Sequence, residues 1–182
     1  MNNDDRVLVA DLQQENKRDL AFGTLVTKYQ ERLYWHIRKI VISHEDADDI
    51  LQNTFVKVWK SIDNFREESS LYTWLYRIAT NESLTYINSN KRKSFVQMNE
   101  TSEFLMNNLM SDPYFDGDEI QLKLQEAILQ LPEKQRLVFN MKYFDAMKYD
   151  AMSEVLDTSV GALKASFHHA SKKIEEYLKN ID

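Results

Sequence analysis

The chain contains very few residues that end helices or form tight turns. Three Gly and two Pro occur among its 182 residues. Because these residues supply most hairpin turns, their scarcity leaves few places where strands could be joined. No stretch shows the alternation of apolar and polar residues that is typical of a strand. We therefore expect an all-α fold, with helices joined by short connections.

One irregular stretch divides the chain in two. Residues 95–118 hold Pro113 and Gly117 among Asn, Ser and acidic residues, a composition typical of a flexible, solvated linker. We expect one small helical domain over residues 1–94 and a second over residues 119–182, joined by this acidic linker.

Apolar residues at three- and four-residue spacing predict four helices on each side of the linker. Before it they cover residues 6–14, 19–41, 43–60 and 71–93, with Ser43 as a capping residue. After it they cover residues 119–130, 132–144, 149–156 and 160–179. Pro132 suits a first helical turn, and Ser159 suits the cap of the last helix. A short helix, a three-residue turn and a longer helix form the pattern of a helix-turn-helix.

The formal net charge of -6 is unevenly distributed. Between Ser94 and Glu126 seven acidic residues stand against Lys123, so this segment accounts for the whole net charge. The rest of the chain sums to zero and can carry a local basic face. Because binding to phosphates depends on local charge, the acidic total does not exclude nucleic acid as a partner.

Composition also bounds the compartment and the chemistry. Without cysteine the chain has no disulfide, thiolate metal site or cysteine nucleophile. Its first twenty residues carry acids among the apolar ones, unlike a secretory leader. No apolar run approaches the roughly 18 residues that span a bilayer. We expect a cytoplasmic protein without membrane insertion, catalytic residues, metal or cofactor.

Two helices present polar faces that suit nucleic acid. The last helix has an outer face that runs from small to basic side chains: Ala162, Ala165, Ser166, His169, Lys172 and Lys173. Small residues permit approach to a major-groove floor, and lysines can meet phosphates. The helix at 71–93 has an outer face of aromatic, amide and cationic side chains: Tyr76, Arg77, Thr80, Asn81, Asn88 and Lys91. Such groups can stack on unpaired bases and bond their edges. The face of the last helix could equally be an ordinary solvated surface, and for the helix at 71–93 taken alone a solvated surface is the favoured interpretation.

The helix at 43–60 begins with His44, Glu45, Asp46, Asp48 and Asp49. Acids in a first turn are stabilised by the helix dipole, so they need no metal. A helical hydrolase that uses these acids with His44 remains an alternative, which metal analysis would test.

Two segments together resemble a known family. Residues 46–93, DADDILQNTFVKVWKSIDNFREESSLYTWLYRIATNESLTYINSNKRK, resemble region two of extracytoplasmic-function (ECF) sigma factors. Residues 131–178, LPEKQRLVFNMKYFDAMKYDAMSEVLDTSVGALKASFHHASKKIEEYL, resemble region four of the same family. The order of the two segments, their spacing and the linker agree with this resemblance.

The resemblance implies a sigma factor, which binds core RNA polymerase and promoter DNA. It places the polymerase-clamp contact at Asp46, Asp49, Gln52 and Asn53. Single-stranded minus-ten DNA would be read by Phe65, Tyr76, Arg77, Thr80, Asn81, Asn88 and Lys91. Duplex minus-thirty-five DNA would be read by Ser159, Ala162, Lys164, Ala165, Ser166, His169, Lys172 and Lys173. The linker would thread toward the RNA exit path of the polymerase, and an anti-sigma factor is a further partner that the resemblance implies.

The last helix departs from the family pattern. Members typically have arginine where this chain has Ser166, His169 and Ser171. Fewer cations release fewer counterions, so we expect the second domain alone to bind DNA weakly and to rely on polymerase for positioning. A stand-alone helix-turn-helix repressor is the main alternative, and it would bind duplex operator without polymerase.

Overall fold

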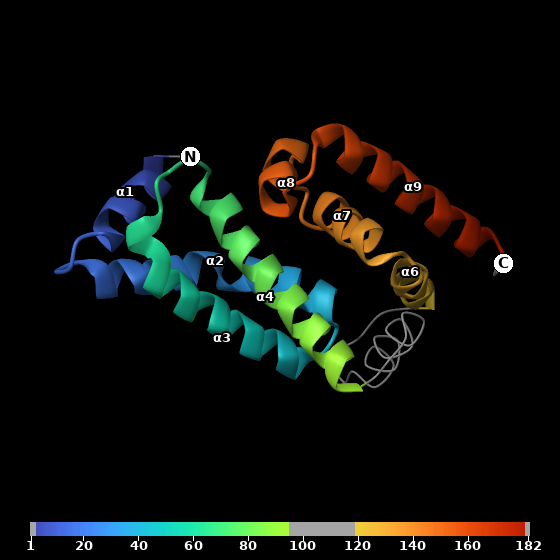
Figure 1. The fold of residues 1–182 in the computed structure, drawn as a ribbon, viewed down its shortest axis with the longest axis horizontal. Coiled ribbons are helices and arrows are strands. Elements are labelled where there is room, and N and C mark those ends of the chain that lie inside the picture. The colour runs from blue at the N-terminus through green and yellow to red at the C-terminus, as the bar shows by residue number, and fades with distance from the viewer. Residues whose placement is uncertain (1–2, 95–118, 181–182) are drawn as a thin grey trace.

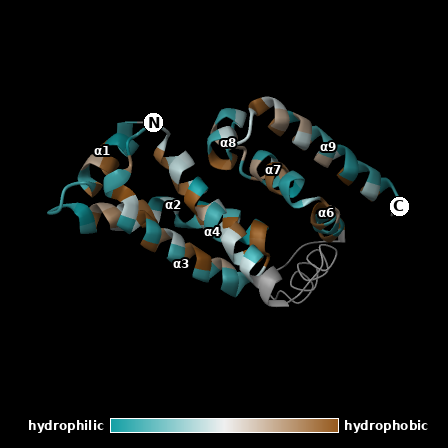
Figure 2. Ribbon diagram, viewed as in Figure 1, coloured by the Kyte–Doolittle hydropathy of each residue, from teal (hydrophilic) through white to brown (hydrophobic). Residues whose placement is uncertain are grey.

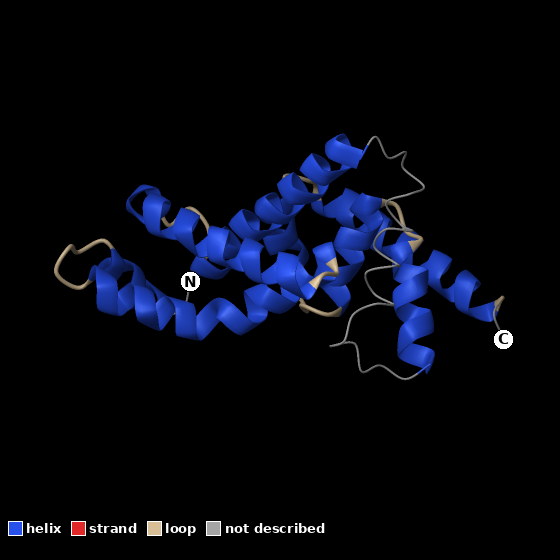
Figure 3. Ribbon diagram, turned by 90° about the horizontal axis from the view of Figure 1, so that it is seen from below, coloured by secondary structure: helices blue, strands red, loops and turns tan. Residues whose placement is uncertain are grey.

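The computed structural model describes the backbone of residues 3–94 and 119–180, and the side chains of residues 3–89 and 120–180. Every regular element within these ranges is a helix (Figure 3), which confirms the expected all-α class. The predicted linker, residues 95–118, lies outside the described residues. None of the described helices is both long enough and apolar enough to cross a membrane.

The helices of the first segment agree with the predicted ranges to within a few residues. They are α1 (Asn3–Leu12), α2 (Arg18–Val41), α3 (His44–Ser61), the single 3-10 turn η1 (Ile62–Asn64) and α4 (Leu71–Ser94). Those of the second segment are α6 (Glu119–Leu129), α7 (Glu133–Tyr143), α8 (Tyr149–Leu156) and α9 (Val160–Lys179). The η1 turn, which directly follows α3, was not predicted.

The first segment is a bundle in which α2 packs against α1, α3 and α4 (Figure 1). Hydrophobic residues recur between hydrophilic ones along these helices (Figure 2), as the spacing predicts. Leu25, Leu33 and Ile37 of α2 are fully buried, together with Val58 of α3 and Leu75 of α4. This shared core fixes the relative positions of the polar faces on α3 and α4.

The junction between α2 and α3 combines an abrupt stop with a capped start. Ile42 has a φ of 68°, in the left-handed region, and its N–H donates to the carbonyl of Arg38. Ser43 then caps α3 by accepting a hydrogen bond from the backbone N–H of Asp46 at 3.3 Å. The serine cap predicted at this position is therefore confirmed.

The second segment has a smaller core of its own. Residues of α6, α7, α9 and the α6–α7 turn form it: Ala127, Ile128, Leu131, Phe139, Ala170 and Ile174. The ring of Phe139 stacks on that of Phe167, with centroids 5.7 Å apart. Pro132 directly precedes α7, so its missing N–H costs the helix nothing.

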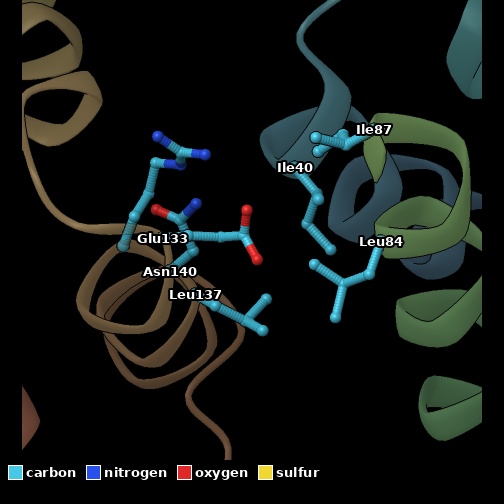
Figure 4. A pocket seen from close by; sticks show the side chains of 7 residues that line it. Ile40, Leu84, Ile87, Glu133, Leu137 and Asn140 are labelled. Atoms are coloured by element: carbon cyan, nitrogen blue, oxygen red, sulfur yellow. The ribbon is translucent and has the colours of Figure 1, made fainter. Parts of the chain in front are cut away.

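The two segments also pack against each other. Helix α8 lies beside α4, and α7 contacts α2 (Figure 1). Leu137, Met141 and Met152 of the second segment belong to the same hydrophobic cluster as the core of the first. A small pocket remains at this junction, where Ile40, Leu84 and Ile87 face Glu133, Leu137 and Asn140 (Figure 4). Part of the second segment therefore shares the hydrophobic core of the first, in addition to the separate core formed by α6, α7 and α9.

Burial predicts which leucines of α2 stabilise the fold. Leu33 is fully buried, whereas Leu20 on the same helix is 81% exposed. We expect Leu33→Ala to lower the free energy of unfolding by about 2–5 kcal/mol, because it removes buried methyl groups and leaves a cavity. Leu20→Ala is the matched control and should change it by less than about 0.5 kcal/mol. Chemical denaturation followed by circular dichroism measures both, and equal losses would contradict the assigned core.

Candidate polymerase and nucleic-acid interfaces

Helix α3 presents one exposed polar face. Asp49, Gln52 and Asn53 are exposed on it, as the predicted polymerase contact requires. Val56, one turn further along the same face, is 50% exposed. Val56 was not among the predicted contact residues, although its position three residues after Asn53 places it on this face. The face therefore combines an acid, two amides and an exposed apolar side chain.

The fourth predicted clamp residue, Asp46, is only half-exposed. Its carboxylate accepts a hydrogen bond from the Tyr86 hydroxyl of α4. His44 nearby lies 2.7 Å from the Tyr34 hydroxyl through Nδ1 and 3.5 Å from Asp48 through Nε2. Within the described residues no group of three His, Cys, Asp or Glu is arranged to hold a metal ion. The acidic start of α3 is thus engaged in ordinary helix-terminal and tertiary contacts.

Helix α4 presents a narrow exposed stripe. Arg77, Asn81 and Asn88 of the predicted minus-ten set are exposed on it. Thr85 is also exposed and lies between Asn81 and Asn88 on the same side, a position that the sequence analysis overlooked. The side chain of Lys91 lies outside the described residues. The stripe can offer a cation, two amides and a hydroxyl to nucleotide bases and phosphates.

Three other predicted minus-ten residues are buried. Tyr76 is 2% exposed, Thr80 1% and Phe65 6%. The ring of Phe65 packs on Trp74 at 4.9 Å between centroids. Burial raises the pKa of the Tyr76 phenol well above its usual range, so this side chain remains neutral. In this arrangement the three side chains form part of the core and do not face solvent.

A buried polar cluster joins α2 and α4 to the loop after α7. His36 Nδ1 lies 2.8 Å from Asp145 Oδ2, and His36 Nε2 lies 2.8 Å from Thr80 Oγ1. Lys39 Nζ donates to Asp145 Oδ1 at 2.6 Å. The side chains of His36 and Asp145 are 0% and 5% exposed. Burial opposes ionisation of Asp145, but hydrogen bonds and positive charge from His36 and Lys39 outweigh it and hold the pKa of the carboxyl below its usual range.

This cluster places a hydroxyl, an imidazole and a carboxylate in the order of a hydrolase triad. The Thr80 hydroxyl, however, also donates to the Tyr76 carbonyl at 2.7 Å. Thr80, His36 and the Asp145 side chain are all shielded from solvent, so a substrate has no access to them here. The cluster therefore acts as a contact between segments. The sequence did not predict it, because Asp145 is more than 100 positions away from His36 and Lys39.

Helices α8 and α9 form the predicted helix-turn-helix. Asp157 ends α8 in the left-handed conformation with φ 47°. The Ser159 hydroxyl then accepts from the Ala162 N–H at 3.3 Å, which confirms the predicted cap of α9. Except for the half-buried Ser166, the predicted minus-thirty-five residues are exposed: Ser159, Ala162, Lys164, Ala165, His169, Lys172 and Lys173. Lys172 Nζ lies 3.8 Å from Glu176, so its charge is partly balanced.

A second group of cations surrounds Tyr149 at the start of α8. Lys142 Nζ lies 4.9 Å from the centre of the Tyr149 ring, and Lys164 Nζ lies 5.8 Å from it. Lys148 is exposed directly before the helix. The sequence analysis assigned a role to Lys164 but not to Lys142 or Lys148. These lysines gather cations at the start of α8, where Asp150 in its first turn offsets part of their charge.

Fold and faces together define an all-helical DNA-binding protein with a helix-turn-helix near its C-terminal end. Comparison with known families gives its place among such proteins. The model of Sigma-70 region 2 matches residues 25–93, and that of Sigma-70 region 4 matches residues 121–174. The first match begins within α2 and extends through most of α4, and the second begins within α6 and ends within α9.

Curated relatives and solved structures agree with these matches. The RNA polymerase sigma-H factor of Pseudomonas aeruginosa is 30% identical over 97% of this chain and 95% of its own. The ECF sigma-E factor of Haemophilus influenzae is 28% identical over 97% of this chain and 96% of its own. CnrH, solved with the cytosolic domain of CnrY, superposes with a TM-score of 0.69 at 24% identity, over 98% of this chain and 99% of its own. The chain belongs to the ECF sigma factors, and it functions as a promoter-recognition factor of RNA polymerase.

The cap at Ser159 predicts the stability of the start of α9. Its side chain satisfies one of the N–H groups that a helix start leaves without a partner. We expect Ser159→Ala to destabilise this turn by about 1 kcal/mol. Hydrogen exchange at the Ala162 amide should accelerate about five-fold, whereas Ser171→Ala, further along α9, should leave it unchanged. Unchanged exchange in Ser159→Ala would show that the cap is not formed in solution.

Proposed function

We propose that the recognition steps of this sigma factor are divided among three exposed faces. The α3 face docks on the polymerase clamp, the α4 stripe captures unpaired minus-ten bases, and the outer face of α9 enters the minus-thirty-five duplex. The observation that carries the proposal is that all three faces are solvent-exposed and occur in the order of the matched regions. The corresponding domain limits are 1–94 and 119–182, with residues 95–118 connecting them.

The α3 face suits a basic partner surface. Asp49 supplies charge, and Gln52 and Asn53 can donate and accept hydrogen bonds. Val56 adds apolar area at the end of the same face. A mixed face of this kind can steer association through its charge and hold the complex through its apolar contact.

The α4 stripe suits bases that have left the duplex. Asn81 and Asn88 can bond base edges, and Arg77 can stack or meet phosphates. Capture of unstacked bases offsets part of the cost of opening, which is a few kcal/mol per extruded base. Phe65, Tyr76 and Thr80 can contribute only after the second segment or the local packing moves. The factor itself adds no catalytic step, because the polymerase makes the RNA.

The α9 face suits binding to duplex DNA with modest affinity. Ala162 and Ala165 let the helix approach the base edges, while Lys164 and Lys173 can reach phosphates. Lys142 and Lys148 extend the phosphate contacts at the start of α8. Because Ser166, His169 and Ser171 lack permanent charge, the contact relies on attachment of the factor to polymerase.

An anti-sigma factor is a further proposed partner. CnrH is solved with the cytosolic domain of CnrY. The sigma factor RpoE of Bartonella quintana is solved with the anti-sigma factor NepR. RpoE superposes with a TM-score of 0.68 at 19% identity, over 87% of this chain and 96% of its own. The exposed α3 face and the junction of the two segments offer surfaces for such a protein. A stand-alone repressor would not need the α3 face. Co-purification with core polymerase distinguishes the two functions, and a chain that binds duplex DNA but never polymerase would contradict the proposal.

Base contacts and backbone contacts on α4 predict different transcription profiles. We expect Asn81→Ala to reduce run-off transcription most for promoters with one particular base in the minus-ten element, because an amide reads a base edge. Lys91→Ala should weaken all promoters alike, by about two- to ten-fold, because an ammonium meets phosphate. Core polymerase with a library of minus-ten variants measures both profiles. Identical profiles for the two substitutions would contradict this division of roles.

An added cation on α9 tests the minus-thirty-five face. We expect His169→Arg to tighten binding of the holoenzyme to a promoter identified by sequencing its transcripts, and to steepen the slope of log K against log salt by about one. Gln30→Arg adds the same charge on the exposed surface of α2 and should leave the slope unchanged. Salt titrations by fluorescence anisotropy compare the two. An equal response of both variants would move the DNA contact away from α9.

A further inference from the structure

We propose that His36, Lys39 and Asp145 form an intrachain latch that holds the free factor closed and withholds Thr80 and Tyr76 from DNA. The inference rests on the proposed function of α4, and it adds a regulatory contact between the two segments. In the closed arrangement the helix-turn-helix segment occupies the side of α4 next to the minus-ten stripe. DNA capture by the complete α4 face then requires the latch to open.

The latch is centred on one carboxylate. Asp145 lies in the loop after α7, and both of its oxygens are engaged by α2: Oδ2 with His36 at 2.8 Å and Oδ1 with Lys39 at 2.6 Å. His36 continues to Thr80 of α4 at 2.8 Å. Asp145 therefore anchors the second segment to α2, and His36 extends the contact from α2 to α4.

A backbone contact fixes the same junction a second time. Asn140, on the last turn of α7, donates from Nδ2 to the carbonyl of Lys39 at 3.2 Å. The ammonium of Lys39 also lies 5.3 Å from the centre of the Phe144 ring. These contacts place the Asp145 loop against one turn of α2, so the carboxylate is held where both His36 and Lys39 can reach it.

Burial makes the carboxylate decisive for this contact. The side chains of His36, Asp145 and Lys39 are 0%, 5% and 18% exposed, so solvent screens their interaction little. The other groups that face the cluster are the phenols of Tyr72 and Tyr76, with Arg32 as a more distant cation. With no second carboxylate among these groups, loss of the Asp145 charge would leave buried donors without an anionic partner. When the two segments separate instead, these donors are exposed to water.

The latch matters for function because Tyr76 and Thr80 are buried beside it. The imidazole of His36 packs on the Tyr76 ring with centroids 4.7 Å apart, and its Nε2 is hydrogen-bonded to the Thr80 hydroxyl. Helix α8 packs against α4, and its apolar residues Met152 and Val155 belong to the same hydrophobic cluster as Tyr76. Arg77, Asn81 and Asn88 stay exposed at the margin. The closed factor therefore offers DNA only part of the minus-ten face.

The absence of cysteine allows a direct test on the full chain. Spin labels at Glu15→Cys, in the exposed turn between α1 and α2, and at Asn180→Cys, after α9, report the distance between the segments by electron resonance. We expect one narrow distance distribution for the otherwise unchanged chain. Asp145→Asn should lower the closed-to-open ratio at least about ten-fold and broaden the distribution. Asp11→Asn breaks an exposed local pair with Lys17 and should leave it narrow.

A milder variant keeps the test valid if Asp145→Asn folds poorly. Lys39→Gln removes the more exposed partner, and we expect a distribution intermediate between the other two. Affinity for a fluorescent pool of random single-stranded 12-mers should rise about three-fold or more in both variants, as Thr80 and Tyr76 become accessible. A broad distribution in the parent chain, or identical distributions and affinities in all variants, would overturn the latch.

The readouts separate the latch from the proposed function. Label distances require neither polymerase nor promoter, so they test the latch alone. Run-off transcription with core polymerase tests the proposed function alone. A chain that transcribes normally yet shows no distance change in Asp145→Asn refutes the latch and leaves the function intact.

Discussion

Helix α2 is buried on two different sides, and most of the structure depends on this. One side carries Leu25, Leu33 and Ile37, which anchor α3 and α4 in the first bundle. The other side carries His36 and Lys39, which receive the second segment through Asp145. A helix buried on only one side would offer the second segment no contact with the first bundle through α2. The two-sided burial of α2 instead sets both the shape of the first bundle and the place where the second can dock.

Helix α4 shows what this double burial means for recognition. Leu71 and Leu75 are buried in the bundle, and Tyr76 and Thr80 contact His36 of α2. The stripe of Arg77, Asn81, Thr85 and Asn88 faces solvent. Side chains that look alike in sequence therefore differ in availability. An amphipathic tyrosine is equally suited to stack on a base or to lie under another helix, and only the tertiary arrangement decides between these positions.

The sequence predicted local features well because their causes are local. Helical periodicity, the serine caps at Ser43 and Ser159, and the exposed faces of α3 and α9 all follow from residues within a turn or two of one another. The η1 turn was missed because the polar loop that contains it has no periodicity. The His36–Asp145 contact was missed because it joins residues 109 positions apart. Assignment of Tyr76 and Thr80 to an outer face used only the angle around α4, which carries no information on what a second segment covers.

The distribution of charge completes this physical picture. Ser166, His169 and Ser171 of α9 carry no permanent charge, and Lys172 shares its charge with Glu176. We therefore expect duplex contacts alone to hold the factor weakly. In the closed arrangement the outer faces of α3 and α9 are nevertheless open, while part of α4 is covered. Polymerase docking and duplex contact can therefore precede capture of unpaired bases. Under the latch proposal, full access to the α4 face requires the two segments to separate, so binding partners that hold them apart would favour promoter opening, and partners that hold them together would oppose it.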